Sequence, residues 1–302
     1  MASGKIAVFG VPSAAGGVAP GMDRAAFALR EAGLLDALRR DGRRVVNLSD
    51  LSLFPFADDP EHASFRNADL AACAIQATAD EMTRALIEGF TLVLGGDCSL
   101  VVGTVAGARK ATGVPVGLVF IDANADLNTP ETSPSGRLAG MALALAIGLG
   151  PKDVAGAAGL RPAVDADHVA LIGFRELDPG ERARLGALGL ALPVTAARAL
   201  GMRATAALAL DAVNNDDGPI VVHFDVDALD PEDMPAKGAI TPGRGFSWRE
   251  ASDLLTALVA SPRVVALEVT EFIPARDPDG VCARQLVELL ARVVGAKGRS
   301  RS

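Results

Sequence analysis

The segment FIDANADLNTPETSPSGR, residues 120–137, places three polar side chains at alternate positions: Asp122, Asn124 and Asp126. In an extended chain, residues i, i+2 and i+4 point to the same side, so two carboxylates and one amide face a single point. Carboxylates that are brought together repel, and each raises its neighbour's pKa unless a cation lies between them. The segment therefore predicts a cation among these side chains.

A second segment, HFDVDALDP at residues 223–231, repeats the alternation with Asp225 and Asp227. Hard divalent ions such as Mn²⁺ and Mg²⁺ prefer oxygen ligands of this kind. A lone aspartate at a strand end more often caps a turn or a helix. Two such clusters favour a metal site over separate caps, because interacting acids concentrate in functional clefts.

Short apolar runs alternate along the chain with longer Ala- and Leu-rich helical patterns. Near-continuous apolar runs are typical of strands that are covered on both faces. The expected strands are Ile6–Gly10, Arg44–Leu48, Thr91–Gly95, Val116–Ile121, His168–Gly173, Ala191–Thr195, Ile220–Asp225 and Val264–Val269. The expected helices are Met22–Arg40, Asn67–Glu88, Ser99–Lys110, Met141–Gly148, Pro179–Leu188, Ala196–Val213, Ser247–Val259 and Val281–Val294.

This alternation predicts an α/β fold with three layers, α/β/α, around an eight-stranded, mostly parallel sheet. Ligand sites in such sheets lie beyond the carboxyl ends of the strands. Many of the unusual polar residues follow the ends of predicted strands: Asp97, Cys98, Asp122, Asn124, Asp126, Asp178, Asp225, Asp227 and Glu268. No shift in composition marks a second domain, so we expect one domain over residues 1–295 and a flexible tail at 296–302.

The bulk composition narrows the class of protein. The chain has 302 residues, of which 50% are hydrophobic, enough for a large core. A net charge of −8 and the lack of a basic stripe argue against a nucleic-acid partner. Three cysteines suggest a reduced, intracellular protein, and we see neither a signal peptide nor an apolar run long enough for a membrane. We expect a cytoplasmic protein.

Several motifs resemble the arginase/agmatinase ureohydrolase family in order and spacing. They are GGDCS (95–99), DANADLNTPETSPSG (122–136), GFRELDPGE (173–181), DVDALDP (225–231) and LEVTEF (267–272). The resemblance covers nearly the whole chain. It implies a three-layer α/β fold with an eight-stranded, mostly parallel sheet, and a homotrimer or homohexamer. It also implies hydrolysis of a guanidinium group to urea at a two-manganese centre, with a metal-bridging hydroxide as nucleophile.

Carried over by position, the resemblance implies two sets of metal ligands. The first set is Cys98, Asp122, Asp126 and Asp225, and the second is Asp122, Asn124, Asp225 and Asp227. The family has histidine at the positions of Cys98 and Asn124. The chain's three histidines are His62, His168 and His223, and we expect the two in strands to be structural.

These replacements predict weaker or altered metal binding. Four aspartates carry charge for two divalent ions, and a Cys98 thiolate would add one more negative charge. We expect one or two ions, with Mn²⁺ first and Zn²⁺ or Fe²⁺ as alternatives, because thiolate favours softer ions. Asn124 offers only a neutral carbonyl oxygen. An equally weighted alternative makes Cys98 a small buried thiol that coordinates nothing.

The resemblance also assigns substrate contacts. Asn128, Ser133 and Ser135 match residues that bind the α-amino acid end of arginine, and Asp178 matches the acid that anchors its ammonium group. We assign catalytic roles to Asp126 and to Glu268, the latter matched to the acid that orients the guanidinium. Arg137 replaces a polar amide and could pair with a substrate carboxylate; an exposed loop arginine is the alternative. Thr241 could line the pocket or simply belong to a TPG turn.

A third departure concerns proton transfer. The family's arginases carry a histidine in SGxxHG that protonates the leaving amine, and SGRLAG (135–140) has Ala139 there. Loss of such a general acid typically costs about 10²–10⁴-fold in rate. An N-hydroxyguanidine, which is less basic and more reactive, would suit a weakened site. The chain is similar in this respect to the hydroxyarginine hydrolase of D-cycloserine biosynthesis.

Three hypotheses follow. The first is a metal-dependent hydrolase of a linear amidine C–N bond in arginine or N-hydroxyarginine, releasing urea or hydroxyurea. The second is a catalytically impaired scaffold or oligomer partner with the same fold, since fold does not guarantee activity. The third is a one-zinc deacetylase-type enzyme, which the arginase-like loop at 128–136 disfavours. The retained acids favour the first.

Overall fold

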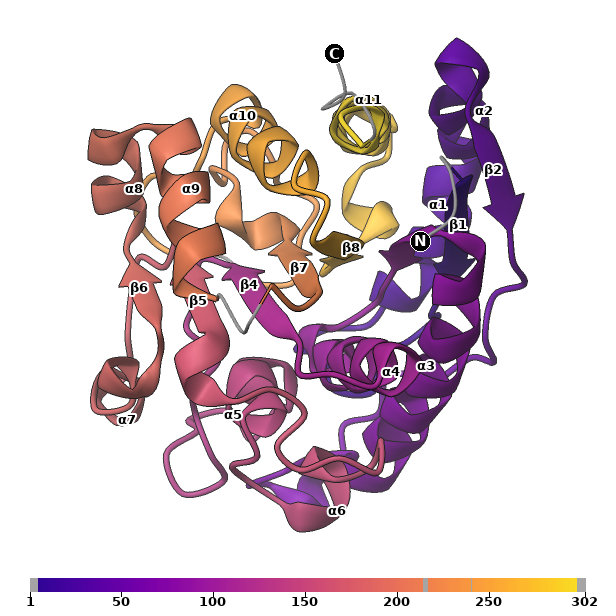
Figure 1. Ribbon diagram of the computed structural model, residues 1–302. Helices are drawn as coiled ribbons and strands as arrows, with labels where there is room; N and C mark the ends of the chain where they lie inside the picture. The colour runs from indigo at the N-terminus through magenta and orange to yellow at the C-terminus, as the bar shows by residue number, and fades with distance from the viewer. Residues whose placement is uncertain (1–4, 214–216, 240, 298–302) are drawn as a thin grey trace.

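The computed structural model describes residues 5–213, 217–239 and 241–297 (Figure 1). Eight strands form one sheet in the order β2-β1-β3-β8-β7-β4-β5-β6, and every neighbouring pair runs parallel. The strands are β1 (Lys5–Gly10), β2 (Arg44–Asn47), β3 (Phe90–Leu94), β4 (Gly117–Ile121), β5 (Val169–Ile172), β6 (Leu190–Leu192), β7 (Ile220–Asp225) and β8 (Val264–Thr270). The predicted eight-stranded α/β sheet is confirmed.

Helices cover both faces of this sheet (Figure 1). The core on one face involves α3, α4, α5 and α6, and the core on the other involves α1, α2, α9, α10 and α11. Their bounds are α1 (Ala25–Glu31), α2 (Leu34–Arg39), α3 (Ala68–Glu88), α4 (Val101–Thr112), α5 (Ala142–Ala146), α6 (Lys152–Ala155), α7 (Pro179–Arg182), α8 (Val194–Leu200), α9 (Met202–Ala212), α10 (Trp248–Val259) and α11 (Val281–Gly295). The three predicted layers are therefore present.

Glycine and proline account for the main differences from the predicted elements. The helix expected over 22–40 is divided at Gly33, whose φ of 90° lies in the left-handed region. The helix expected over 196–213 is two helices that meet at Gly201. The strand expected to reach Thr195 ends at Leu192, because Pro193 begins the next helix. The short helix α6 was not expected from the sequence.

Helix α10 begins as its sequence indicates. The Ser247 hydroxyl accepts a hydrogen bond from the Glu250 amide at 3.2 Å, and the Glu250 carboxylate accepts one from the Ser247 amide at 2.9 Å. This reciprocal capping satisfies amides that the first helical turn leaves without partners. Arg198 of α8 adds an ion pair to Glu250 at 2.6 Å and lowers the pKa of that carboxyl to about 2.

Lys297, the last of the described residues, is tied to the body of the domain. The ammonium group of Lys297 donates to the carbonyl oxygens of Ser261 and Val264 and lies over the Phe90 ring. The rest of the predicted tail, residues 298–302, lies outside the described residues. None of the helices in the described ranges combines the length and the apolar character that a bilayer-spanning segment needs.

The strand order brings the polar segments together. Strands β3, β8, β7 and β4 are consecutive neighbours in the sheet, although they are far apart in the chain. The register pairs Phe120 of β4 with His223 of β7, and His223 with Glu268 of β8. Side chains at paired positions stand on the same face. These three residues therefore form a row across the sheet, just before the strands end.

Candidate metal and substrate site

A cavity of about 300 Å³ opens beyond the carboxyl ends of these strands. Six of its lining residues are acids, and none of the lining residues in the described part of the chain is a lysine or arginine. The lining is Val18, Cys98, Asn124, Asp126, Asn128, Ser133, Pro134, Ser135, Ala139, Gly140, Asp178, Glu181, Asp225, Asp227, Ala239 and Glu271. Such a lining suits a cationic occupant.

Three aspartates converge behind this cavity. Asp122, Asp225 and Asp227 each offer a carboxylate oxygen within 4.8 Å of the others, and all three are buried. Backbone amides donate hydrogen bonds to two of these carboxylates: Asp122 accepts from the Asn124 amide at 2.7 Å, and Asp225 accepts from the Asp227 amide at 2.6 Å. The second oxygen of Asp122 is buried without a hydrogen-bond partner. An unpartnered buried carboxylate oxygen is expensive unless a cation or proton meets it.

Burial and mutual repulsion perturb the acids. Burial, and then the charge of Asp227, raises the pKa of Asp122 and of Asp225 well above their usual range. Burial, and then Asp122, does the same to the pKa of Asp126, which also has a positive φ of 50°. A divalent ion among these oxygens would reverse the effect, because a nearby positive charge favours the ionised form. The donor set therefore fits a divalent metal.

The two histidine replacements are both built into this cluster. Asn124 donates from Nδ2 to Asp227 at 3.0 Å, and its Oδ1 accepts from the Thr241 hydroxyl at 3.1 Å. The thiol of Cys98 lies 3.0 Å from Asp225 Oδ2 and 3.1 Å from the Thr270 hydroxyl. The amide oxygen of Asn124 thus faces Thr241 rather than the carboxylates, whereas the Cys98 sulfur faces the acids directly.

Burial, and then the charge of Asp225, raises the pKa of the Cys98 thiol. In the absence of an ion the thiol is therefore protonated and donates its hydrogen bond to Asp225. A thiolate at this position requires an adjacent cation. Cys98 is 1% exposed, so its sulfur is buried and also faces the carboxylates of the predicted metal site.

Two cations that the sequence analysis does not name stand behind Asp227. Lys237 is fully buried, and its ammonium group donates to the backbone carbonyls of Asp227 at 3.2 Å and Leu229 at 3.1 Å. The Arg175 guanidinium donates to the Asp227 carbonyl at 3.1 Å. Burial lowers the pKa of both groups. Arg175 lies within the GFRELDPGE segment (173–181), whereas Lys237 lies outside the quoted motifs and no local signal identifies it.

The structure places the two glutamates of LEVTEF differently from the sequence analysis. Glu268, expected to orient the guanidinium, is fully buried outside the cavity, where its carboxylate meets Thr104 of α4 and His223. Glu271 instead lines the cavity and accepts from the Cys98 amide at 3.3 Å. Because Glu271 has a φ of 67°, the chain turns there as it leaves the sheet. Glu268 is not among the residues that line the cavity.

The loop after Asp126 supplies most of the expected substrate contacts. Asn128 donates to Asp178 at 2.8 Å, and its own carbonyl oxygen is buried without a partner. Ser133 and Ser135 also line the cavity, and their hydroxyls accept from the Gly136 and Arg137 amides. These four predicted residues thus meet at the cavity.

Glu181 is a lining residue that the sequence analysis missed. Its carboxylate accepts from the Leu127 amide at 3.1 Å and from the Asp178 amide at 2.9 Å, which ties α7 to the substrate loop. Burial raises its pKa. The spacing of Asp178 and Glu181 is a capping-box signature, which was available in the sequence.

Arg137 does not line the cavity. Its guanidinium donates to the Ala57 carbonyl and to Asp58, both at 2.8 Å, and lies 4.5 Å above the Phe56 ring. The predicted contact of Arg137 with a substrate carboxylate stays a prediction. The alternative of an exposed loop arginine is wrong, because Arg137 is 7% exposed.

Two further residues occupy expected places. Asp97 fixes the β3–α4 loop, accepting from the Ser13 hydroxyl at 2.8 Å and the Ser99 amide at 3.2 Å. Ala139 lines the cavity and offers no titratable group to a leaving amine. A methyl group at residue 140 would meet no atom within 4 Å, which indicates open space beside Ala139.

Comparison with known proteins agrees with this geometry. A model of the arginase family matches residues 4–295. The arginase of Brevibacillus brevis is 32% identical over 298 residues, covering 97% of this chain and 98% of that relative. The arginase of Bacillus subtilis (strain 168) is 32% identical over 296 residues with the same coverage. A crystal structure of arginase from Bacillus cereus aligns with a TM-score of 0.85 at 30% identity, covering 96% of this chain and 98% of that one. On the match of fold, acidic cluster and sequence over nearly its whole length, this chain belongs to the arginase family.

Proposed function

We propose that this chain hydrolyses the C–N bond of a linear amidine in an arginine-type amino acid, releasing urea from arginine or hydroxyurea from N-hydroxyarginine. The acid-lined cavity carries this proposal, because its six acids and uncharged amide and hydroxyl groups suit a cationic guanidinium. The curated relatives named as arginases support the same class of reaction.

The metal that such a reaction uses would be held by Asp122, Asp126, Asp225 and Asp227, with Cys98 and Asn124 at the histidine positions. The unpartnered oxygen of Asp122 and the raised pKa values of the cluster support a bound cation. A divalent ion there would supply Lewis acidity and make water nucleophilic at neutral pH. Mn²⁺ is the family's usual ion, and the sulfur of Cys98 widens the choice to Zn²⁺ and Fe²⁺.

The α-amino acid end of the substrate would bind at Asn128, Ser133, Ser135 and Asp178. Asp178 carries the charge that an ammonium group needs, and Asn128 holds it at 2.8 Å while keeping its own oxygen unpartnered. Decarboxylated substrates lack the carboxylate that the serine hydroxyls and amides of this loop would bind. We therefore favour an amino acid over agmatine.

The guanidinium end would be oriented by Glu271 rather than Glu268. Glu271 lies at the cavity, and the carbon of a side chain added at Gly238 would lie 2.0 Å from its Oε2, so glycine keeps space for this carboxylate. Asp126 would take the proton from the attacking water and pass it to the leaving amine. With Ala139 in place of a histidine, this carboxyl carries more of the proton transfer, which favours a less basic hydroxyguanidine.

The test is product release from a substrate panel after reconstitution with Mn²⁺, Zn²⁺ or Fe²⁺. We expect urea or hydroxyurea from arginine or N-hydroxyarginine and much less product from agmatine. Asp126→Asn should abolish turnover, whereas Asp178→Asn should chiefly raise KM. Exposed Asp69→Asn, on α3, is the matched control and should behave as wild type. No turnover of any guanidino compound with any ion would favour the scaffold hypothesis instead.

We also propose that the chain works as a homotrimer or homohexamer, as the resemblance implies. Large apolar side chains remain exposed on the described surface, including Ile87, Phe27 and Leu53. Sedimentation equilibrium of the purified protein would measure the assembly. A monomer at micromolar concentration would contradict the proposal. The cytoplasmic location stays a prediction of the sequence.

A further inference from the structure

A buried histidine that the proposed reaction does not use stands beside the cysteine at the metal site. His223 lies in β7, fully buried, and belongs to a group with Cys98 and Asp122 whose donor atoms all lie within 4.8 Å of one another. We propose that Cys98 Sγ, a carboxylate oxygen of Asp122 and His223 Nε2 bind one borderline-soft divalent ion, such as Zn²⁺. The imidazole would thus come from a strand instead of the two family loop positions.

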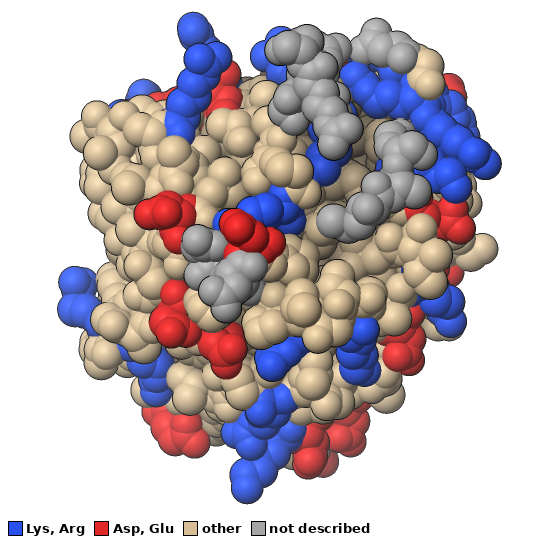
Figure 2. Space-filling model, in the orientation of Figure 1, with Lys and Arg blue, Asp and Glu red and all other residues tan. Residues whose placement is uncertain are grey.

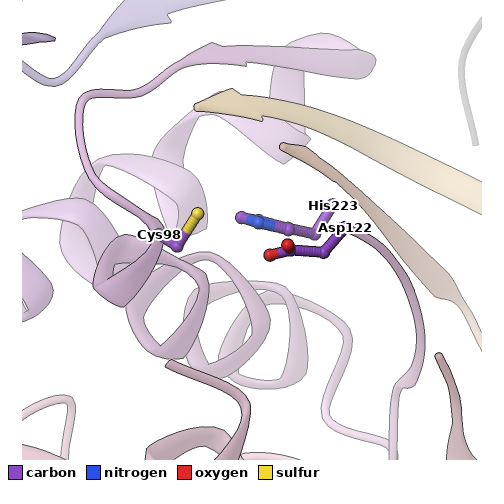
Figure 3. A group of neighbouring side chains, drawn as sticks. All are labelled: Cys98, Asp122 and His223. Carbon is purple, nitrogen blue, oxygen red and sulfur yellow. The ribbon is translucent and has the colours of Figure 1, made fainter. Parts of the chain in front are cut away.

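The three side chains converge from separate elements. Cys98 begins the short 3₁₀ turn at the start of α4, Asp122 follows β4, and His223 belongs to β7. Figure 3 shows the edge of the His223 ring and the Asp122 carboxylate both directed toward the Cys98 sulfur. Because β4 and β7 are paired strands, the relative position of Asp122 and His223 is fixed by the sheet.

The ring of His223 is held in the orientation that a ligand needs. Its Nδ1 lies 2.7 Å from Glu268 Oε2, and its face stacks on Phe120 at 4.3 Å with an interplanar angle of 9°. Nε2 therefore faces Cys98, and its nearest hydrogen-bond partner, the Thr270 hydroxyl, is distant at 3.4 Å. A metal-bound histidine usually donates its other nitrogen to a carboxylate, which fixes the tautomer. Glu268 supplies that carboxylate as a positioning residue.

The other two ligands are prepared for a cation. Asp122 is fully buried, and its Oδ2 has no hydrogen-bond partner. Ion binding would displace the thiol proton of Cys98 to solvent. One thiolate and one carboxylate then balance the two positive charges of the ion, with a neutral imidazole beside them.

The donor atoms select the class of ion. Sulfur, nitrogen and one carboxylate oxygen are the ligands of zinc and Fe²⁺ sites, whereas Asp122, Asp225 and Asp227 together offer only oxygen and suit Mn²⁺. Ligand atoms of a tetrahedral zinc lie about 3.3–3.5 Å apart. The donor atoms of this group lie within 4.8 Å of one another, so the widest pair must approach by at most about 1.5 Å to reach that spacing.

The inference concerns ion binding and stands apart from the proposed reaction. If His223 were only a packing residue, the ion would sit among aspartate oxygens and Cys98 would remain a protonated thiol. The two arrangements give different spectra. Cobalt bound by thiolate in a tetrahedral site shows strong charge-transfer and d–d absorption, whereas cobalt in an octahedral oxygen site is pale.

The experiment uses tag-free full-length protein with the substitutions His62→Asn and His168→Asn. The chain has three histidines, so this background leaves His223 as its only imidazole. We expect one equivalent of Co²⁺ with a thiolate charge-transfer band, and X-ray absorption of the Zn²⁺ form with one sulfur and one imidazole in the first shell. Zn²⁺ should bind more tightly than Mn²⁺.

Variants then assign the ligands. Cys98→Ser should abolish the thiolate band, and His223→Asn should abolish the imidazole signal and weaken Zn²⁺ binding. Glu268→Gln should weaken Zn²⁺ binding by about 10–100-fold while keeping the thiolate band. The matched controls are Cys282→Ser, which removes a remote buried thiol, and Cys73→Ser, which removes an exposed one. Both should leave the cobalt spectrum unchanged.

An all-oxygen first shell, or no ion bound at all, would overturn the inference. Urea assays separate its fate from that of the proposed function. Turnover with Mn²⁺ bound only by oxygen would contradict this inference and support the proposed function. An ion bound by sulfur and imidazole without turnover would support this inference and contradict the proposed function. If His223→Asn does not fold, X-ray absorption in the two-histidine-deleted background decides the question alone.

Discussion

At the scale of single residues, Asn124 and Cys98 stand where the family resemblance predicts histidines, and both side chains form hydrogen bonds with their neighbours. Asn124 bridges Asp227 and Thr241, and Cys98 bridges Asp225 and Thr270. Each side chain is therefore matched to several neighbours. A substitution at Asn124 or Cys98 therefore removes hydrogen bonds from the neighbouring residues as well as changing the metal ligands.

Restoring both histidines should shift the metal preference toward manganese. Cys98→His with Asn124→His replaces a sulfur and an amide with two imidazoles, which suit Mn²⁺ better than thiolate does. We expect the ratio of Mn²⁺ to Zn²⁺ affinity to rise by at least about tenfold, or about 1.4 kcal/mol, measured by competition with a chelating dye. Cys282→Ser with Asn47→His, away from the site, is the control. An unchanged ratio would show that positions 98 and 124 do not contact the ion.

Glu271, in the turn that follows β8, should contribute to catalysis, whereas an exposed glutamate should not. Glu271→Gln removes a charge from the cavity, so kcat/KM should fall by about 10–100-fold, the effect of one charge-assisted hydrogen bond. Exposed Glu176→Gln should leave kcat/KM unchanged. Steady-state kinetics with arginine and N-hydroxyarginine measure both variants. A Glu271→Gln enzyme with normal kcat/KM would remove this residue from the proposed substrate contacts.

At the scale of elements, the packing of α3 on α4 positions Cys98. Two glycines of α4 let the helices approach closely: a β-carbon at Gly103 would lie 2.4 Å from the Ile75 carbonyl, and one at Gly107 would lie 2.5 Å from the Ala79 carbonyl. The turn that carries Cys98 leads directly into α4. Separating the helices would therefore move the sulfur as well as weaken the core.

Gly103→Ala should destabilise the fold and disturb the metal site. Overpacking of this kind costs about 1–3 kcal/mol of unfolding free energy, and metal affinity should fall along with it. The control is Gly186→Ala, where an added β-carbon would meet no atom within 4 Å. Urea unfolding with and without the ion measures both effects. A Gly103→Ala protein as stable as Gly186→Ala would contradict the close approach.

At the scale of the whole molecule, the negative charge is concentrated inside. Eight buried acids stand against two buried bases among the described residues, so the interior holds a formal charge of −6 out of the chain's −8. On the face shown in Figure 2, basic and acidic side chains are interspersed between uncharged areas. Most of the chain's formal negative charge is therefore assigned to buried acids.

This buried charge predicts an unusual pH dependence for the ion-free protein. Burial first and neighbouring carboxylates second raise the pKa values of Asp122, Asp126, Asp225 and Glu271. The folded state then binds more protons than the unfolded state above the ordinary carboxyl pKa of about 4. This stability is fully present below that value and is lost as the pH rises through the raised values.

Chelator-treated protein should therefore be less stable at about pH 7.5 than at about pH 5.5. Each group that keeps its proton in the folded state but is ionised in the unfolded state lowers the unfolding free energy by about 1.4 kcal/mol per pH unit. Urea unfolding measures the trend, and added Zn²⁺ or Mn²⁺ should abolish it. His62→Asn is the control, because the hydrogen bond to Asp59 raises the pKa of His62 and gives a slope of the same sign. Constant stability across this window would contradict the acid cluster.

The sequence by itself determined the sheet, the layers and the position of the acids. Buried parallel strands are recognisable as short apolar runs, and these runs place the acids at the ends of β4 and β7. The extended alternation expected there is wrong, because Asp126 has a positive φ of 50° and Asp227 lies in the 3₁₀ turn Val226–Ala228. Capping at Ser247 and Glu250 is equally local. The strands, the acids at their ends and the helix cap depend on residues that are close in the sequence, so the sequence alone was sufficient to predict them.

Only the tertiary structure decided which side chains of different strands meet. Glu268 and Glu271 lie three residues apart, and nothing local distinguishes the one that faces His223 from the one that turns into the cavity. The Lys237 ammonium group donates to the Asp227 carbonyl across a loop, and the Arg137 guanidinium donates to Asp58. His223, expected to be structural, reaches Cys98 and Asp122 because β7 lies beside β4 in the sheet. Register and strand order are long-range properties, and they fix this chemistry.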